Sequence, residues 1–175
     1  KKTEERLLYH LSKPKMYDII SKAHLEANRK EISNQKYIIW DGSAIPKVYA
    51  KKMEGLANVY DGASKKKSKL ETGYHWDNIV GVSKSDTGEV TVFPIHSEIY
   101  SKDLDPCRIN LSENAKILDT HLKIQPYMSA DSIAVMDRGF DRKMLIYPFI
   151  GRGQNFIIRQ TGIRHLEFED GSGCE

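Results

Sequence analysis

Apolar residues near the start of the chain recur at three-to-four spacing, which is the period of an α-helix. The pattern covers residues 4–32 and is interrupted at Pro14, a residue that the interior of a helix disfavours. It therefore predicts two N-terminal helices that pack on the elements that follow. The residues that carry the pattern are Leu7, Leu8, Leu11, Met16, Ile19, Ile20 and Ala23.

Two short segments further along, residues 37–40 and 133–136, are apolar at every position. Continuous apolar runs of this length suit central strands that are buried on both faces. Each run ends directly in an aspartate, Asp41 or Asp137. Residues 42–71 are polar and contain several Gly and Lys residues, so we expect a long loop after the first strand.

Two helices are predicted in the second half of the chain. Ser112 is placed to cap a helix that ends near Pro126, and Asp141 is placed to cap a short helix that Pro148 limits. The first of these helices has an apolar stripe, which consists of Ala115, Ile117, Leu118 and Leu122.

Strands near residues 74–83 and 89–95 flank a turn in which Gly88 can take the positive φ of a hairpin loop. Residues 155–159 form another β-prone run. A hairpin after the first strand, followed by helical crossovers, requires a sheet that is antiparallel among its first three strands and parallel afterwards. We therefore expect an α/β fold, a ribonuclease-H-like mixed sheet flanked by helices with an N-terminal helical segment.

We expect one folded domain, because 39% apolar and 29% charged residues in a chain of 175 are ordinary for a globular protein. Residues 1–34 would be the helical segment, residues 35–165 a partial ribonuclease-H-like core, and residues 166–175 a tail or the start of an insertion.

Several classes of protein are disfavoured. No apolar run approaches the roughly 18 residues that cross a bilayer, so we expect no membrane partner and a cytoplasmic, nucleoid-associated protein. Cys107 and Cys174 are far apart, which supports neither a disulfide framework nor a zinc knuckle. His75 and His96 are expected to be hydrogen-bonded histidines rather than zinc ligands.

The candidate site is the pair of aspartates after the apolar runs. An aspartate after a strand most often caps a turn or helix, and that interpretation stays open for both. If the two strands are neighbours, however, the carboxylates of Asp41 and Asp137 converge and require a shared proton or a cation. Such oxygen ligands favour Mg²⁺ or Mn²⁺, and two ions roughly 4 Å apart can carry an in-line phosphoryl displacement. Two aspartates are too few ligands for an ion pair, so a third acid is expected.

Three further segments read WDGSAIPK at 40–47, GLANVYDGAS at 55–64 and VMDRGFD at 135–141. These segments resemble successive blocks of the DDE transposases of bacterial insertion sequences, of the fourth-group type. The resemblance implies that Asp41 and Asp137 are two of three catalytic metal ligands. It places the third, a Glu, in a Tyr-Arg-Glu-Lys signature that this sequence lacks, and Glu167 and Glu169 follow Asp137 too soon to replace it.

Basic residues are the second group of candidates. The net charge of +3 is small, but lysines cluster at residues 47–52 and 65–69, where the alternative is a plain solvated loop. The resemblance also implies DNA contact by arginines beyond the last strand, which could equally be surface residues. We expect double-stranded DNA to bind at Lys47, Lys65, Lys66, Lys67, Lys69, Arg138, Arg159 and Arg164.

These residues and the resemblance predict the catalytic core of a DNA transposase. Such an enzyme cuts transposon ends by metal-dependent hydrolysis and joins them to target DNA, as a homodimer in the active complex. Because the third acid is missing, residues 1–175 should fold but neither cut nor join DNA. Two alternatives stay open: a ribonuclease-H-like nuclease without strand transfer, and a catalytically dead DNA-binding or assembly protein.

Replacing Lys65, Lys66, Lys67 and Lys69 with Ala should weaken the binding of duplex DNA, because lysine contacts with phosphates release counterions. The affinity of the unaltered chain should fall as salt rises, and the substituted chain should show a shallower slope. Fluorescence anisotropy of a labelled duplex over a salt series measures both quantities. An affinity that responds neither to salt nor to the substitutions would make this run a solvated loop.

Overall fold

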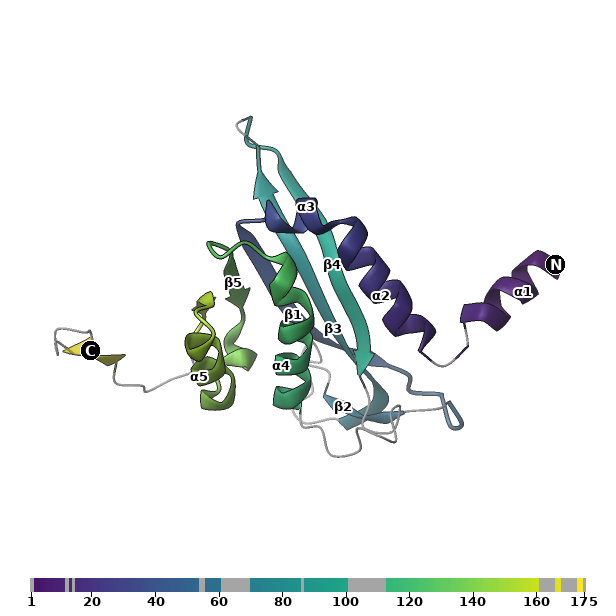
Figure 1. Cartoon of the computed structure of the whole chain (residues 1–175). Helices are drawn as coiled ribbons and strands as arrows, with labels where there is room; N and C mark the ends of the chain where they lie inside the picture. The colour runs from purple at the N-terminus through teal and green to yellow at the C-terminus, as the bar shows by residue number, and fades with distance from the viewer. Residues whose placement is uncertain are drawn as a thin grey trace.

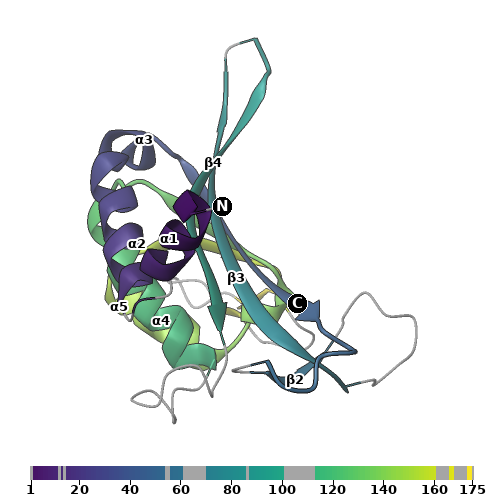
Figure 2. The ribbon, with the colours of Figure 1, turned by 90° about the vertical axis from the view of Figure 1, so that its right-hand side faces the viewer.

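Helices cover one face of an open, mixed sheet of 6 strands, so the fold is α/β as predicted (Figure 2). The computed structural model describes residues 2–11, 13, 15–53, 56–60, 70–85, 87–100, 113–160, 166–167 and 173–174. No helix in these ranges is both long and apolar enough to span a membrane.

The sheet combines antiparallel and parallel pairs. Its strands are β1 (Tyr37–Pro46), β2 (Ala57–Tyr60), β3 (Leu70–Lys84), β4 (Val90–Tyr100), β5 (Ile133–Met136) and β6 (Asn155–Ile158). They lie in the order β2-β3-β1-β5-β6, and β4 also pairs with β3 (Figure 1). The pairs of β3 with β1, β2 and β4 are antiparallel, whereas β5 is parallel to both β1 and β6. This confirms the predicted mixture of directions. A separate ladder joins β7 (Leu166–Glu167) to β8 (Gly173–Cys174).

β1 is longer than its apolar run predicted. Every residue of the strand, from Tyr37 to Pro46, has a partner on β3, so the strand continues through Asp41 rather than ending there. Part of the loop expected at residues 42–71 is therefore strand, and β2 occupies another part of it. Pairing with a long neighbour, rather than an apolar side-chain pattern, holds the second half of β1 in the sheet.

The prediction that β1 is buried on both faces was wrong. Ile38 and Trp40 are buried, but Tyr37 and Ile39 are 41% and 36% exposed. Successive side chains of a strand point to opposite faces, and in the described part of the chain the helices lie over one face only (Figure 2). β1 is therefore half-buried although its first four residues are all apolar.

The N-terminal region forms separate helices, as predicted: α1 (Lys2–Leu11), α2 (Met16–Ala27) and the short α3 (Arg29–Ser33). α2 packs along β4, where the Tyr17 hydroxyl donates to the Ser97 carbonyl at 2.8 Å. α1 instead stands apart from the sheet, and Lys15 between the two helices has a positive φ of 67° (Figure 1). The expected packing on later elements therefore holds for α2 and not for α1.

The hairpin of β3 and β4 follows its sequence signal. Gly88 has a φ of 88°, the positive value that its turn position was expected to need. The Ser85 amide donates to the Glu89 carbonyl at 2.9 Å and closes the turn. The predicted antiparallel pair is confirmed, and both strands are longer than predicted.

Helix α4 (Glu113–Ile124) crosses from β4 to β5, but the predicted apolar stripe describes it only in part. Leu122 is 50% exposed, whereas the polar residues Thr120 and His121 are fully buried. The helix is thus rotated from the expected orientation, because His121 has partners inside the core. Ser112, its predicted cap, lies outside the described residues.

The second crossover helix, α5 (Lys143–Gly151), also departs from prediction. Arg142, not Asp141, is the residue that precedes it, and no side chain caps its first turn. Pro148 lies inside the helix instead of ending it. Proline removes one N–H that would have bonded to the carbonyl of Met144.

An aromatic group centred on His121 joins the crossover helices to β1. Its ring centroid lies 5.9 Å from that of Trp40 and 4.7 Å from that of Phe149. Burial lowers the pKa of His121, so its ring is neutral at pH 7. Its Nε2 lies 3.2 Å from Oε1 of Gln154, whose own Nε2 donates to the Ser132 carbonyl at 2.9 Å. A histidine can therefore occupy a core position here.

Gly73 should be intolerant of a side chain because it lies where three strands meet. A Cβ there would lie 2.4 Å from the Ile45 carbonyl oxygen and 2.9 Å from Cγ2 of Val59. Since a backbone oxygen moves only with its strand, Gly73→Ala should lower the free energy of unfolding by about 1–3 kcal/mol. In the matched control Gly42→Ala, the nearest atom would lie at 3.6 Å, an ordinary contact. Urea unfolding of both variants measures the difference, and equal losses would contradict this account.

Candidate functional site

The parallel pairing of β1 with β5 brings the two predicted aspartates to adjacent strands. Its last pair is Trp40 opposite Met136, so the next residues along the two strands are Asp41 and Asp137. Both aspartates are exposed. The expectation that the two strands are neighbours is confirmed, and the carboxylates therefore leave the same region of the sheet.

Asp137 also holds the turn that follows β5. Its Oδ1 accepts a hydrogen bond from the Gly139 amide at 2.8 Å, in a short 3-10 helix η3 (Arg138–Phe140). A Cβ on residue 139 would lie 3.0 Å from that oxygen, so glycine suits the position. Asp137 is therefore a turn cap, which was the alternative interpretation of the sequence, and the bond fixes the direction of its carboxylate.

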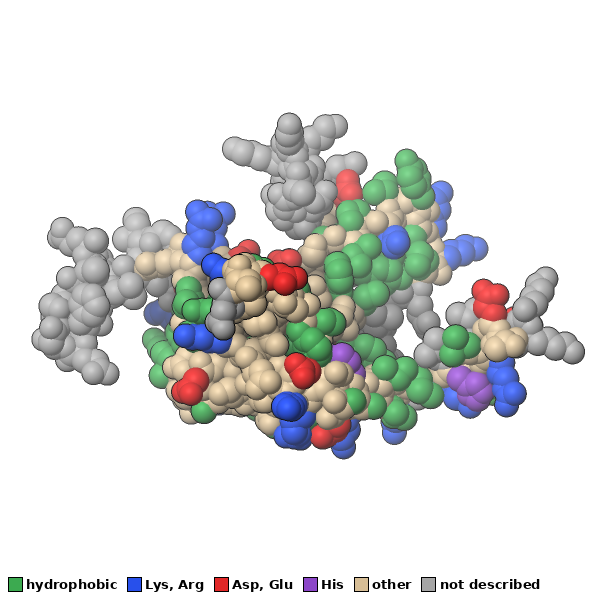
Figure 3. All heavy atoms as spheres, turned by 90° about the horizontal axis from the view of Figure 1, so that it is seen from above, with side chains coloured by type: hydrophobic (Ala, Val, Ile, Leu, Met, Phe, Trp, Pro, Cys, Tyr) green, Lys and Arg blue, Asp and Glu red, His purple; other side chains and the backbone are tan. Residues whose placement is uncertain are grey.

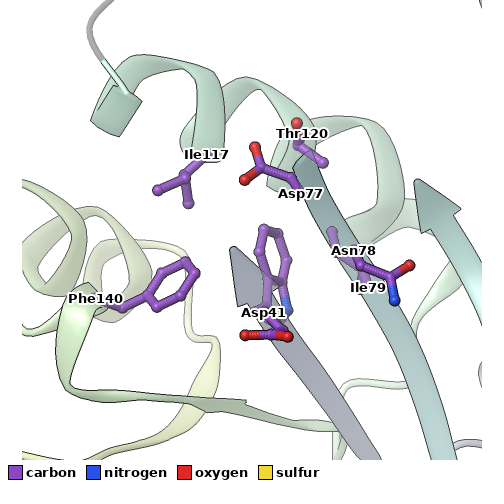
Figure 4. A pocket seen from close by; sticks show the side chains of 8 residues that line it. Asp41, Asp77, Asn78, Ile79, Ile117, Thr120 and Phe140 are labelled. Atoms are coloured by element: carbon purple, nitrogen blue, oxygen red, sulfur yellow. The ribbon is translucent and has the colours of Figure 1, made fainter. Parts of the chain in front are cut away.

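A small pocket lies beside Asp41. Figure 4 shows Asp77 pointing toward Ile117 and Thr120 of α4, whereas the carboxylate of Asp41 points away from them. The register explains the difference: Asp77 is the partner of Gly42, so it leaves the sheet on the opposite face from Asp41. The pocket is lined by Trp40, Asp41, Asp77, Asn78, Ile79, Ile117, Thr120 and Phe140.

Asp77 is an acidic residue that was not among the site residues predicted from the sequence. Burial raises its pKa, the nearby carboxylates of Glu113 and Glu98 raise it further, and the Lys116 ammonium opposes them. Its position in the predicted strand 74–83, next to Asn78 and so on the opposite face of that strand, was the one available signal. Asp77 is thus a half-buried acid under α4 and does not share the face of Asp41.

The donor atoms near the two aspartates match a hard divalent cation in type and fall short in number. Carboxylate oxygens are the ligands that Mg²⁺ and Mn²⁺ prefer. Asn78, the register partner of Asp41 on the same face, adds an amide oxygen of the same class. Among the described residues, no three His, Cys, Asp or Glu side chains gather closely enough to hold a metal ion.

Two of the predicted DNA-binding residues lie close to Asp137. Arg138 follows it directly in η3, and the Arg159 amide lies 3.4 Å from the carbonyl oxygen of Met136, the last residue of β5. Both arginines are exposed. The structure therefore brings Arg138 and Arg159 to the same end of β5 as the candidate site.

The other basic candidates are not gathered there. Lys47 is exposed after the far end of β1, six residues from Asp41, which is about 20 Å along a strand. Lys65, Lys66, Lys67, Lys69 and Arg164 lie outside the described residues. Among the described residues on the face that Figure 3 views, acidic and basic side chains are interspersed and form no continuous basic stripe.

A polar group between α2, β4 and α4 was also missed. His96 is buried, and its Nε2 lies 3.3 Å from Oε2 of Glu98, while its Nδ1 lies 3.4 Å from the Ser21 hydroxyl. Lys116 donates to the other carboxylate oxygen of Glu98. The expectation of a hydrogen-bonded His96 is confirmed. Its partners were not predictable because they depend on where α2 crosses the sheet.

No protein-family model matches this chain, and no curated protein matches it. The likeness to transposases therefore depends on the motif residues themselves.

Asp77→Asn should raise the free energy of unfolding at pH 7. The raised pKa means that the folded protein holds ionised Asp77 less well than the unfolded chain does. This cost appears as pH rises above the ordinary pKa of 3.8 and is absent below it, where both states are protonated. Urea unfolding at pH 7 and pH 3 measures the gain in the variant. The control is Asp131→Asn, at an exposed position. If Asp77→Asn raised the free energy of unfolding equally at both pH values, that would contradict the raised pKa of Asp77.

Proposed function

We propose that this chain is the catalytic core of a DDE-type DNA transposase with a ribonuclease-H-like fold. The observation that carries the proposal is the parallel register of β1 and β5, which leads to Asp41 and Asp137 on neighbouring strands. The strand order supports it, since an antiparallel group of four strands, β1 to β4, is followed by parallel strands reached through helices. The segments at 40–47 and 135–141, which resemble the family's blocks, contain these same two aspartates.

In the proposed site, Asp41 and Asp137 would hold Mg²⁺ or Mn²⁺ together with a third acid. Bound ions of this kind activate the attacking water or 3′-hydroxyl and stabilise the leaving oxygen of a phosphodiester. The contribution of the chain itself is placement. β1 and β5 hold the carboxylates on neighbouring strands, and the Gly139 amide orients that of Asp137.

The arginines at the end of β5 have a separate part in the proposal. Arg138 and Arg159 are exposed beside Asp137 and supply positive charge for the phosphate backbone of double-stranded DNA. Contacts of this kind position a duplex without reading its bases. Transposon ends and target DNA would both be held in this way, by two copies of the chain in the active complex.

Two other functions use the same residues. A ribonuclease-H-like nuclease would hydrolyse DNA without joining it. A DNA-binding or assembly protein would keep Asp137 for its turn, and the hydrogen bond to Gly139 is the observation that favours this reading. Joining of transposon-end DNA by a chain completed with a third acid distinguishes the transposase from both.

The unaltered chain should bind Mn²⁺ weakly, and the double variant Asp41→Asn with Asp137→Asn should bind it at least tenfold more weakly. An incomplete ligand set leaves most of the ion's water shell in place, and the substitutions remove its two anionic ligands. Asparagine keeps an oxygen that accepts the Gly139 amide, so the turn should survive. Isothermal titration calorimetry measures the affinity.

The control for this experiment is Asp18→Asn with Asp131→Asn, which removes the same charge from two other exposed positions. Loss of Mn²⁺ affinity in the control as well would indicate a general charge effect. Unchanged Mn²⁺ binding after substitution of Asp41 and Asp137 would overturn the proposed metal site.

A further inference from the structure

The sheet face that carries Asp41 has no helix over it in the described part of the chain (Figure 2). Ile38 and Trp40 are buried under the helices, so the alternate residues of β1, Tyr37 and Ile39, point to this second face. Register partners on neighbouring strands share a face. The registers therefore place a group of apolar residues side by side here, which we call the bare stripe: Tyr37, Ile39, Val80, Val82, Val92, Pro94, Ile133, Val135 and Ile157.

The bare stripe is open to solvent at both ends and in the middle. Val92 of β4 and Ile157 of β6, at its two ends, are 59% and 54% exposed, and Tyr37 of β1 is 41% exposed. A contiguous apolar surface of this kind marks a site of interaction with another element. The function proposed above does not use it.

The shape of the bare stripe fits one helix. It is two residue rows deep, about 14 Å, and five strands long, about 24 Å. The next row consists of Ser97, Asn78 and Asp41, and Lys84 follows Val82 on the opposite side. A helix has a diameter of about 10–12 Å and would cover the two apolar rows only. A second sheet would also cover the polar row and remove the Asp41 carboxylate from water, which is unfavourable.

Helix α1 is amphipathic and has no contact surface on its own sheet. Leu7, Leu8 and Leu11 recur at three-to-four spacing, so they lie along one side of the helix. α1 stands apart from the sheet (Figure 1), and Leu7 is 58% exposed. An isolated helix shorter than about 12 residues is marginal in water, so α1, with 10 residues, requires a surface to pack on. Its length of about 15 Å covers more than half of the bare stripe.

α1 cannot reach the bare stripe of its own chain. The next helix, α2, contributes Leu25 to the core on the other face, and packed layers lie about 10 Å apart, so α1 would have to move about 20 Å across the sheet. The chain from Leu11 to Met16 spans at most about 18 Å when fully extended. It is turned instead, because the Lys13 amide donates to the His10 carbonyl at 3.3 Å and the Met16 amide donates to the Lys13 carbonyl at 3.1 Å. A helix on the bare stripe must therefore come from another molecule.

We propose that α1 of one copy docks its leucine side on the bare stripe of a second copy, while α1 of the second copy docks on the first. One contact covers about 15 Å by 14 Å, roughly 200 Å² on each surface, which is too little for a specific complex. Two reciprocal contacts bury roughly 800 Å², the low end of transient complexes. We therefore expect a closed dimer in equilibrium with its monomer. The inference is independent of the proposed metal site.

Sedimentation velocity of the full chain over a concentration series measures this equilibrium. Leu7→Asp and Ile39→Asp should each weaken dimerisation by about tenfold or more, because each places an unpaired charge in the contact. Both positions are exposed in the single chain, so the fold should survive, and circular dichroism checks it. Leu7→Met and Ile39→Val keep the apolar contact and should dimerise nearly as the unaltered chain does. Tyr147→Asp adds the same charge at a 65% exposed position of α5 and is the matched control.

A mixture of the two charged variants identifies which surfaces meet. The Leu7→Asp chain keeps an intact bare stripe and the Ile39→Asp chain keeps an intact α1, so one of the two contacts can form between them. Anisotropy of dye-labelled Leu7→Asp chain should therefore rise on titration with Ile39→Asp chain, and rise less on titration with unlabelled Leu7→Asp chain. A dimer built from two α1 helices, or from two bare stripes, would not be restored, because each contact would still contain one altered surface.

A full chain that stays monomeric over the series, or a mixture that associates no better than either variant alone, would overturn the exchange of α1. Equal losses in Tyr147→Asp would overturn it as well. Mn²⁺ binding should be the same in Leu7→Asp as in the unaltered chain. If Mn²⁺ binds and no dimer forms, the proposed function stands without this inference. A dimer that responds to these variants and binds no Mn²⁺ would reject the metal site and support the exchange of α1.

Discussion

The backbone pairing of β1 on both of its edges is the interaction on which the rest of the structure depends. Along one edge all ten residues of the strand pair antiparallel with β3, and along the other its first four pair parallel with β5. A parallel neighbour has to be reached by a crossover, so α4 must pass over the sheet before β5 begins. The buried side chains of β1, Ile38 and Trp40, then meet that crossover and α5, and the aromatic group around His121 forms there.

Elements with a local signal were predictable from the sequence. β5 and β6 are marked by short β-prone runs, and the β3–β4 turn by a glycine that needs a positive φ. The second half of β1 has no such signal, because Gly42, Ser43 and Pro46 are poor strand formers that stay in the sheet through pairing with β3. The burial of His121 was not predictable from the local sequence either, because the hydrogen-bond partner of its ring, Gln154, lies 33 residues away.

The candidate site likewise contains residues that were predictable from the sequence and residues that were not. Asp41 and Asp137 could be found because each directly follows an apolar run, and their meeting required only that the two runs be neighbours. Asp77 required the register of β1 with β3, which decides the face on which it lies. The contact of Tyr17 with Ser97 required the crossing of α2 over β4, and periodicity does not encode a contact between residues 80 positions apart.

The two aspartates also differ in stiffness. Asp41 lies within a strand, and its neighbours on both sides pair with β3, so its Cα moves only with the sheet. Asp137 lies one residue past β5, on a three-residue turn whose far end is anchored by the buried ring of Phe140. The backbone of Asp41 is therefore the fixed reference of the site, and the backbone of Asp137 can move only with the turn at residues 137–140, whose Gly139 amide holds its carboxylate.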